Sequence, residues 1–243
     1  MQYHILASGS KGNSFVLKDQ DVYLMIDCGS NKTYLTKSLK KLNIKPKDLS
    51  AVLITHDHYD HISQIKLFQD NEIYTPIQLE GVNYQIIEPY QVFYIKHLKI
   101  TAIPLSHDSE VVVGYIIESD SEKLVYVTDT GYLSLKNQAY IKDADYYIFE
   151  SNHDPEMLMN SDRPYHVKQR ILSANGHLCN EDAVEILARA VTTRSKEIVL
   201  AHLSEEANDH QLATATATKR FNGLGVKVTT AQQFEIVSGG RDE

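Results

Sequence analysis

Cysteine is scarce in this chain, which limits both how the fold can be held together and where the protein can work. Only Cys28 and Cys179 occur among 243 residues, so there is no disulfide framework. Two thiols of this kind suit a reducing cytosol, and we therefore expect a cytoplasmic protein. Its stability must come from a hydrophobic core, for which this length is sufficient.

Long hydrophobic runs are absent as well. No stretch approaches the roughly 18 apolar residues that a membrane-spanning helix needs, so no membrane association is expected. Residues 1–6 lack the basic region and the long apolar stretch of a signal peptide, and they are typical of a first strand. Apolar residues make up 42% and charged residues 23% of the chain, which is ordinary for a globular protein.

Basic residues are outnumbered, with 24 Lys and Arg against 32 Asp and Glu and a net charge of -8. This balance argues against a large nonspecific nucleic-acid surface. It still allows a nucleic-acid substrate, because a local basic patch and metal ions can hold phosphates. One local cluster comprises Lys37, Lys40, Lys41, Lys45 and Lys47. A solvated helix face explains this cluster more simply, and we favour that interpretation.

Strand-like and helix-like segments alternate along the chain, without an internal repeat or a linker rich in Pro, Gly or Ser. Strands are predicted at 3–7, 14–18, 22–26, 51–55, 73–75, 91–95, 98–103, 111–118, 124–128, 146–150, 198–201, 226–229 and 234–237. Helices are predicted at 33–42, 133–141, 167–173, 180–191 and 212–221. Asn180 is the expected N-cap of the fourth helix. One α+β domain spanning 1–243, with two sheets in contact and helices outside them, is the simplest account.

The segment that follows the predicted strand at 51–55 is the most informative in the chain. It reads His56-Asp57-His58-Tyr59-Asp60-His61, and imidazole and carboxylate are the usual ligands of zinc and similar ions. His56 and His58 can close on one ion, whereas Asp60 and His61 can reach a second. Four such side chains beside one strand end would be hard to bury unpaired, so a metal site is favoured over a purely structural role.

Three later strands also end in ligand-type residues. The segment at 100–105 leads to His107, the strand at 124–128 leads to Asp129, and the strand at 198–201 leads to His202. Each residue alone is a weak signal, because a histidine after a strand is often structural and an aspartate there is often a turn residue. Together with the first cluster, their number and placement strengthen the prediction of a metal site.

The order of these residues resembles the ligand series of the metallo-β-lactamase superfamily: His56, His58, Asp60, His61, His107, Asp129 and His202. More specifically, the chain resembles the WalJ/YycJ branch of metal-dependent hydrolases. The motifs that carry this resemblance run from the first strand to beyond residue 200. They are ASGSKGNS at 7–14, IDCG at 26–29, TDTGY at 128–132, ESNHD at 150–154, GHLCN at 176–180 and AHLS at 201–204.

This resemblance implies an αββα four-layer sandwich that holds two divalent ions per chain, zinc or manganese. It assigns His56, His58 and His107 to one ion, and Asp60, His61 and His202 to the other. Asp129 would bridge the two ions, so that Asp60 and Asp129 both serve the catalytic centre. Two ions about 3.5–4 Å apart can share one solvent molecule and convert it to a bridging hydroxide that attacks the substrate.

Five further residues are candidates for supporting roles. Asp27 resembles the first aspartate of the superfamily and is expected to orient a ligand histidine, although it could simply stabilise a turn. His153 is the first candidate for binding phosphate or protonating the leaving group, and a structural loop histidine is the alternative. His177 could bind a substrate phosphate or pack. Ser8 and Asn13 could line the substrate cleft or belong to a plain hairpin turn.

The resemblance further implies a 5′-to-3′ exonuclease, with DNA favoured over RNA as its substrate. A small-molecule metallo-hydrolase acting on a thioester, lactone or cyclic phosphodiester is the first alternative. A metal-stabilised, non-enzymatic binding module is the second. The seven-residue ligand set with a shared carboxylate argues against that module, because structural zinc sites are usually closed, four-coordinate and often cysteine-rich.

Overall fold

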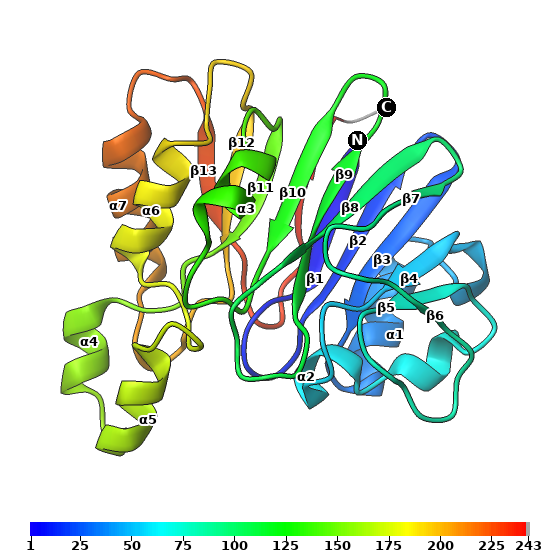
Figure 1. Cartoon of the computed structure of the whole chain (residues 1–243), viewed down its shortest axis with the longest axis horizontal. Helices are drawn as coiled ribbons and strands as arrows, with labels where there is room; N and C mark the ends of the chain where they lie inside the picture. The colour runs from blue at the N-terminus through cyan, green and yellow to red at the C-terminus, as the bar shows by residue number, and fades with distance from the viewer. Residues whose placement is uncertain (242–243) are drawn as a thin grey trace.

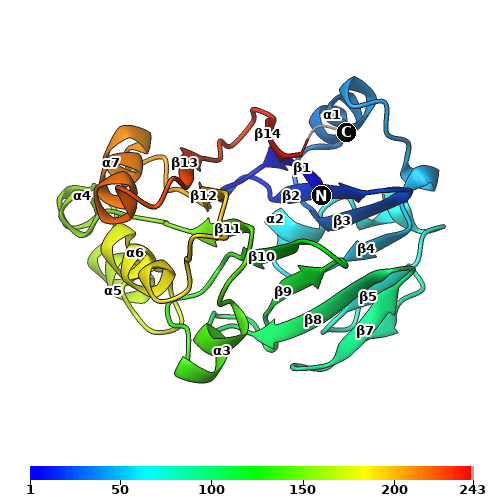
Figure 2. The same ribbon diagram turned by 90° about the horizontal axis from the view of Figure 1, so that it is seen from above.

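The computed structural model describes residues 1–241 as two seven-stranded sheets that pack face to face, with helices on both outer surfaces (Figures 1 and 2). The first sheet has the order β14 (Val237–Gly240), β1 (Gln2–Ala7), β2 (Ser14–Asp19), β3 (Val22–Cys28), β4 (Ala51–Leu53), β5 (Ile73–Thr75) and β6 (Gln85–Ile86). The second has the order β13 (Lys227–Thr230), β12 (Glu197–Ala201), β11 (Tyr146–Glu150), β10 (Lys123–Val127), β9 (Val113–Glu118), β8 (Leu98–Pro104) and β7 (Val92–Ile95). The predicted αββα sandwich is confirmed.

The helices lie in the two outer layers and in the connections beside the ends of the sheets. They are α1 (Lys32–Lys41), α2 (Tyr59–Ile62), α3 (Leu135–Tyr140), α4 (Pro155–Asn160), α5 (Tyr165–Ile171), α6 (Asn180–Ala188) and α7 (His210–Phe221), with short 3-10 helices η1 (Pro46–Asp48) and η2 (Ile65–Phe68). Helix α1 covers the first sheet through Leu35 and Leu39, and α6 and α7 cover the second. Within residues 1–241, no helix is both long and apolar enough to cross a membrane.

The central strands are apolar over most of their length because both of their faces are covered. In β11, Tyr146 and Ile148 belong to the core between the two sheets. Tyr147 and Phe149 point the other way and pack in the core beneath α6 and α7. This period of two assigns each side chain to one of two cores. The polar residue Glu150 stands at the carboxyl end of this strand.

Several strands run in the same direction and so end at the same edge. Strands β3 and β4 pair in parallel, as do β10, β11 and β12. Strand β9 is antiparallel to both β8 and β10, so β8 runs in the direction of β10. Functional sites in α/β sheets form beyond the carboxyl ends of such strands. The ligand-type residues that follow these strands are therefore brought to one side of the sandwich.

The structure also corrects some local predictions. The strand predicted at 234–237 is wrong, because β14 begins at Val237. The predicted N-cap Asn180 is wrong as well. Cys179 occupies that position and its Sγ accepts a hydrogen bond from the Asp182 backbone N–H at 3.4 Å, while Asn180 lies inside the helix. Helices α2 and α4 are not predicted by periodicity, because four to six residues are too short for a repeating pattern.

Candidate metal centre

The seven predicted ligands lie together where strands of both sheets end. Strand β4 leads to His56 and His58, and the single turn of α2 carries Asp60 and His61. The other three follow strands of the second sheet: His107 after β8, Asp129 after β10 and His202 after β12. Residues far apart in the sequence thus converge because their strands run in the same direction.

Three residues near these strand ends have unusual backbone geometry. Asp27, Asp129 and His202 have φ angles of 55°, 59° and 57°. The left-handed region is uncommon for residues other than glycine, and such residues cluster at functional sites. Asp129 and His202 follow β10 and β12, whereas Asp27 lies inside β3, where the register with β2 shifts. The left-handed conformation keeps each side chain in the buried space between the loops.

Among residues 1–241, ligand-type atoms form four groups, each with its atoms within 4.8 Å of one another: His56, His58 and His107; Asp60, His61 and His202; His56, His61 and Asp129; and Asp129, Glu150, His177 and His202. The first two groups are the two sets of three that the resemblance implies. Asp129 lies between these two groups. Its Oδ2 is 3.2 Å from His61 Nε2, and its Oδ1 is 3.7 Å from His107 Nε2 and 3.4 Å from His202 Nδ1. The structure therefore brings the seven side chains together, and their division between two ions with a shared carboxylate, which the resemblance implies, stays a prediction.

Most of the histidine rings are held in place through Nδ1. The partners are Thr55 Oγ1 for His56 at 3.0 Å, Asp27 Oδ2 for His61 at 2.8 Å, the Gly176 carbonyl for His107 at 3.0 Å and Glu150 Oε1 for His202 at 3.1 Å. A metal-binding histidine usually has its second ring nitrogen fixed in this way, which leaves Nε2 free to coordinate. The four rings are thus oriented by contacts within the protein.

Unsatisfied polar atoms at the centre show that its residues fit a cation. Within residues 1–241, His56 Nε2, His202 Nε2 and Asp129 Oδ2 are buried without a hydrogen-bond partner. Leaving such atoms unpaired costs free energy, which a bound cation would offset. Nitrogen donors with some carboxylate oxygen suit zinc or manganese. The donor set therefore fits divalent metal cofactors.

The protonation states at the centre differ between its residues. Burial acts to lower the pKa of both His61 and His202, but Asp27 and Asp129 raise the pKa of His61 well above its usual value, and Asp129 and Glu150 raise that of His202 to about 9, so these two rings must release a proton in order to bind a metal. Burial acts to raise the pKa of Asp129, but His202 and His61 outweigh burial and hold that pKa well below its usual range. Burial lowers the pKa of His56 well below its usual value and lowers that of His107 as well. The carboxylate is therefore ionised and these two imidazoles are neutral. These are the protonation states in which both groups coordinate metals.

Asp27 lies behind the centre and contacts one of its histidines. Its fully buried carboxylate accepts hydrogen bonds from the Thr55 backbone N–H at 2.9 Å and from Thr55 Oγ1 at 2.8 Å. Its Oδ2 is also 2.8 Å from His61 Nδ1. These are the contacts of a residue that orients a ligand, which is the role predicted for Asp27.

The substitution Asp27→Asn is expected to weaken metal affinity by about 10- to 100-fold, as for other groups that orient metal ligands. The amide keeps the size of the side chain, but its NH₂ group cannot accept the bonds that the second oxygen receives. Competition against a chromophoric chelator measures the affinity, and circular dichroism checks that the fold is kept. Asp21→Asn, at an exposed turn, is the matched control. Equal affinities of the two variants would contradict the positioning role.

Glu150 is not among the site residues predicted from the sequence, yet it contacts two of the site histidines. The residue ends β11 and is fully buried. Its Oε1 lies 2.7 Å from His177 Nδ1 and 3.1 Å from His202 Nδ1, and its Oε2 accepts the Thr130 N–H at 2.8 Å. Burial acts to raise the pKa of Glu150, but the neighbouring histidines lower it to about 2. The one available sequence signal is a charged residue that ends an otherwise apolar strand.

His177 and His153 occupy different environments. The His177 ring lies 4.8 Å from the His107 ring and 5.1 Å from the His202 ring, and its side chain is 16% exposed. His153 is buried, neither of its ring nitrogens has a hydrogen-bond partner in the described chain, and burial lowers its pKa to about 4. His177 therefore combines contact with the centre and access to solvent. The reaction role of His153 stays a prediction.

Ser8 and Asn13 fasten the loop after β1 to the centre. Ser8 Oγ accepts a hydrogen bond from the His202 N–H at 2.8 Å. Asn13 Nδ2 donates to Asp60 Oδ2 at 3.2 Å and lies 2.9 Å from His61 Nε2. Both side chains are buried. Their contacts are with other site residues, and their predicted part in substrate binding stays a prediction.

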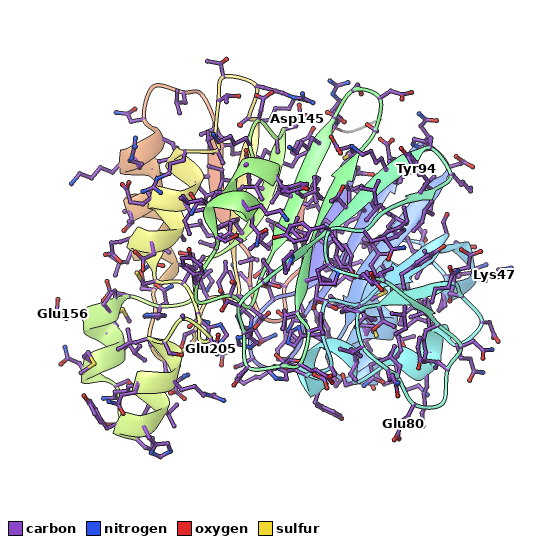
Figure 3. All side chains as sticks on the ribbon, in the orientation of Figure 1. Lys47, Glu80, Tyr94, Asp145, Glu156 and Glu205 are labelled. Carbon is purple, nitrogen blue, oxygen red and sulfur yellow. The ribbon has the colours of Figure 1, made fainter. Side chains whose placement is uncertain are left out.

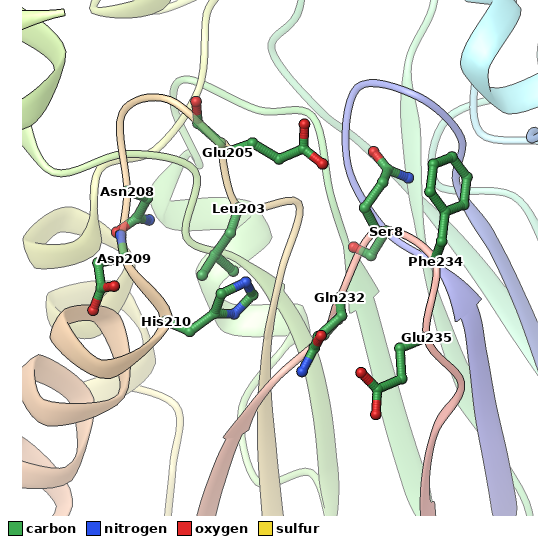
Figure 4. Close-up of a pocket in the computed structure, with 12 residues that line it drawn as sticks. Ser8, Leu203, Glu205, Asn208, Asp209, His210, Gln232, Phe234 and Glu235 are labelled. Carbon is green, nitrogen blue, oxygen red and sulfur yellow. The ribbon is translucent and has the colours of Figure 1, made fainter.

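A cavity of about 510 Å³ adjoins the centre at Ser8 and at Leu203, the residue after His202 (Figure 4). Glu205 and Asp209 lie along one part of its lining and Glu235 along another. Three acidic side chains around one cavity, of which Glu205 pairs with Lys11, make it unfavourable for phosphate groups. A nucleic-acid backbone that reached the centre would therefore be expected to approach from another side.

Comparison with known proteins agrees with the geometry. The model of the beta-lactamase superfamily domain matches residues 23–203. Exodeoxyribonuclease WalJ of Streptococcus pneumoniae serotype 2 is 36% identical over 245 residues, which cover 93% of this chain and 91% of that protein. Exodeoxyribonuclease YycJ of Bacillus anthracis is 32% identical over 250 residues, which cover 97% of this chain and 94% of that protein.

A solved structure shows the same fold. The metallo-beta-lactamase fold protein YhfI from Bacillus subtilis aligns with a TM-score of 0.74 at 21% sequence identity, covering 98% of this chain and 99% of that chain. The family model and the two exodeoxyribonucleases extend the likeness from fold to sequence. The chain therefore belongs to the metallo-β-lactamase superfamily, as a WalJ-like metal-dependent hydrolase.

Proposed function

We propose that this hydrolase is an exonuclease that digests DNA from the 5′ end and holds two divalent ions per chain. The observation that carries the proposal is the position of Asp129, within 3.7 Å of ligand atoms from both groups of three. A carboxylate shared in this way suits two adjacent ions, whereas a single closed site would need only one group. The exodeoxyribonuclease names of the two relatives support DNA as the substrate.

The residues at the metal centre have different roles in this proposal. When bound, two divalent ions would activate a water molecule and neutralise the charge that builds up on a phosphodiester. Asp60, Asp129 and the five histidines would hold them. Asp27 and Glu150 fix the rings of His61 and His202, so that no reorganisation is needed as the reaction proceeds.

We assign proton delivery to His177. Its Nδ1 is held by Glu150, so Nε2 is the ring atom available to the substrate. The ring lies beside those of His107 and His202, which belong to different ligand groups. A group in that position can reach the leaving oxygen of a phosphodiester that spans the centre. Proton transfer of this kind contributes about 10²- to 10⁴-fold in rate.

The activity itself is tested on end-labelled DNA. Protein loaded with zinc or manganese is expected to release mononucleotides from a 5′-phosphorylated duplex, with the 5′ label released first, and to lose this activity when the metal is chelated. Elemental analysis is expected to give two ions per chain. A matched RNA duplex is expected to be cut more slowly.

Three outcomes would contradict parts of the proposal. Earlier release of a 3′ label would overturn the polarity, and faster cleavage of RNA would overturn the preference for DNA. Failure to cut any nucleic acid, combined with hydrolysis of a thioester, a lactone or a cyclic phosphodiester, would replace the nuclease with a small-molecule hydrolase at the same centre.

A further inference from the structure

One face of the molecule carries a concentration of lysines that the proposed chemistry does not use. We call it the lysine face: Lys32, Lys37, Lys40 and Lys41 on α1, and Lys45 and Lys47 just after it. All six side chains are exposed, and Figure 3 shows Lys47 projecting from the outer edge of the molecule. Between residues 32 and 48 the only acidic residue is Asp48. The whole chain, by contrast, has a net charge of -8.

These lysines are free to meet a partner. Among residues 1–241, none of the six forms an ion pair, whereas Lys96, Lys99 and Lys227 elsewhere all face carboxylates. A solvated helix face in an acidic protein would be expected to pair some of its lysines with the abundant carboxylates. The absence of any such pair leaves a positive field on this face, which attracts a polyanion.

The lysine face is joined firmly to the metal centre. The segment before α1 packs against α2, so closely that a Cβ on Gly29 would lie 1.5 Å from the Asp60 carbonyl oxygen. The next residue, Ser30, accepts hydrogen bonds from Ser63 Oγ at 3.0 Å and from Gln64 Nε2 at 2.9 Å. Helix α1 therefore begins beside the turn that carries Asp60 and His61. A DNA strand that leaves the metal centre on this side would meet Lys32 first.

A groove of about 710 Å³ runs along the same face. Lys32, Lys40 and Lys45 line it together with Leu39 and Ile44. Lysines beside an apolar surface suit a single nucleic-acid strand, whose phosphates contact the ammonium groups while sugars and bases cover the floor. The cavity beside His202 has the opposite character, because its wall is acidic.

We propose that the lysine face binds the phosphates of the DNA strand that extends beyond the cleaved nucleotide. This inference rests on the proposed nuclease function and adds the path of the substrate. The ten residues of α1 span about 15 Å, which corresponds to about four nucleotides at 3.4 Å each. Lysines that neutralise phosphates release counterions from the DNA. The affinity for DNA therefore falls as the salt concentration rises. A dinucleotide is too short to use this face.

The test compares two triple variants of the full-length, metal-loaded protein. Lys32→Gln, Lys40→Gln and Lys45→Gln together remove the three charges of the lysine face that line the groove. Lys96→Gln, Lys99→Gln and Lys227→Gln together remove the same charge from positions that pair with acidic residues elsewhere. The measurement is kcat/KM for a 20-nucleotide DNA and for a dinucleotide, both 5′-phosphorylated, over a series of salt concentrations.

For the lysine-face variant, we expect the ratio of the two kcat/KM values to fall by about tenfold, through KM for the long DNA. The slope of log kcat/KM against log salt should become shallower by about 2 to 3, or roughly 0.7 to 0.9 for each phosphate that the variant no longer neutralises. The control variant should keep the wild-type ratio. Equal slopes for the two variants, or an equal loss on both substrates, would overturn the inference while leaving the nuclease function intact. Wild-type protein that cuts neither substrate would overturn the proposed function.

Discussion

Asp129→Ala is expected to lower the rate of DNA hydrolysis by about a thousandfold or more and to reduce the metal content of the protein. Asp129 lies close to ligand atoms of both groups, and it is buried and ionised. Its loss would leave the centre with fewer negative charges to hold two cations. Metal ions contribute several kcal/mol of transition-state stabilisation, and each 1.36 kcal/mol is about a factor of ten in rate.

The measurements are single-turnover cleavage of 5′-labelled DNA and elemental analysis after dialysis. Asp57→Ala is the matched control, since Asp57 lies in the same histidine-rich segment but is exposed and accepts a hydrogen bond from Ser109 Oγ. The control is expected to keep the wild-type rate and metal content. An Asp129→Ala protein that still held two ions and worked within tenfold of wild type would show that the carboxylate is not shared between metals.

His177→Ala is expected to reduce cleavage of DNA by about 10²- to 10⁴-fold, because a sugar oxygen needs a proton in order to leave. The same variant should hydrolyse bis(p-nitrophenyl) phosphate at a rate near that of wild type, since p-nitrophenolate leaves without a proton. Glu150→Gln is expected to reduce DNA cleavage in the same selective way, with an added loss from the freed His202 ring. This dependence on the leaving group separates proton delivery from metal binding.

His153→Ala provides the contrast for this experiment. The sequence makes His153 the first candidate for leaving-group protonation, whereas its buried ring and lowered pKa favour His177 for that role. If the leaving-group-dependent loss follows His153→Ala and not His177→Ala, our assignment of the proton donor is wrong. Thermal unfolding of both variants would reveal any loss that comes from the fold alone.

Local patterns are sufficient for much of the fold and for the candidate ligands. Apolar strands buried on both faces are recognisable without a structure, and residues just beyond them can be read directly, as with Asp129 after 124–128. The first cluster places four ligand-type residues within six positions of the chain. The resemblance to a family then supplies the division into two groups.

Contacts between distant segments cannot be predicted in this way, because side chains that meet through folding leave no periodic signal. Asp27 and His61 are 34 residues apart, and Glu150 and His202 are 52 apart. The motif at 150–154 contains Glu150, but nothing in the sequence indicates that this residue contacts two histidine rings. The lysines after residue 31 are visible in the sequence, but the pattern alone favours a solvated helix face.

The sequence by itself thus determined which side chains could bind metal and that their strands would form a layered α+β sandwich. The tertiary structure alone decided what holds those side chains, that Glu150 fixes the partly exposed ring of His177, and that the lysines of α1 form no ion pair within residues 1–241. The physical reason is the direction of the strands. Parallel strands of both sheets end at one edge, and residues from the whole length of the chain meet there.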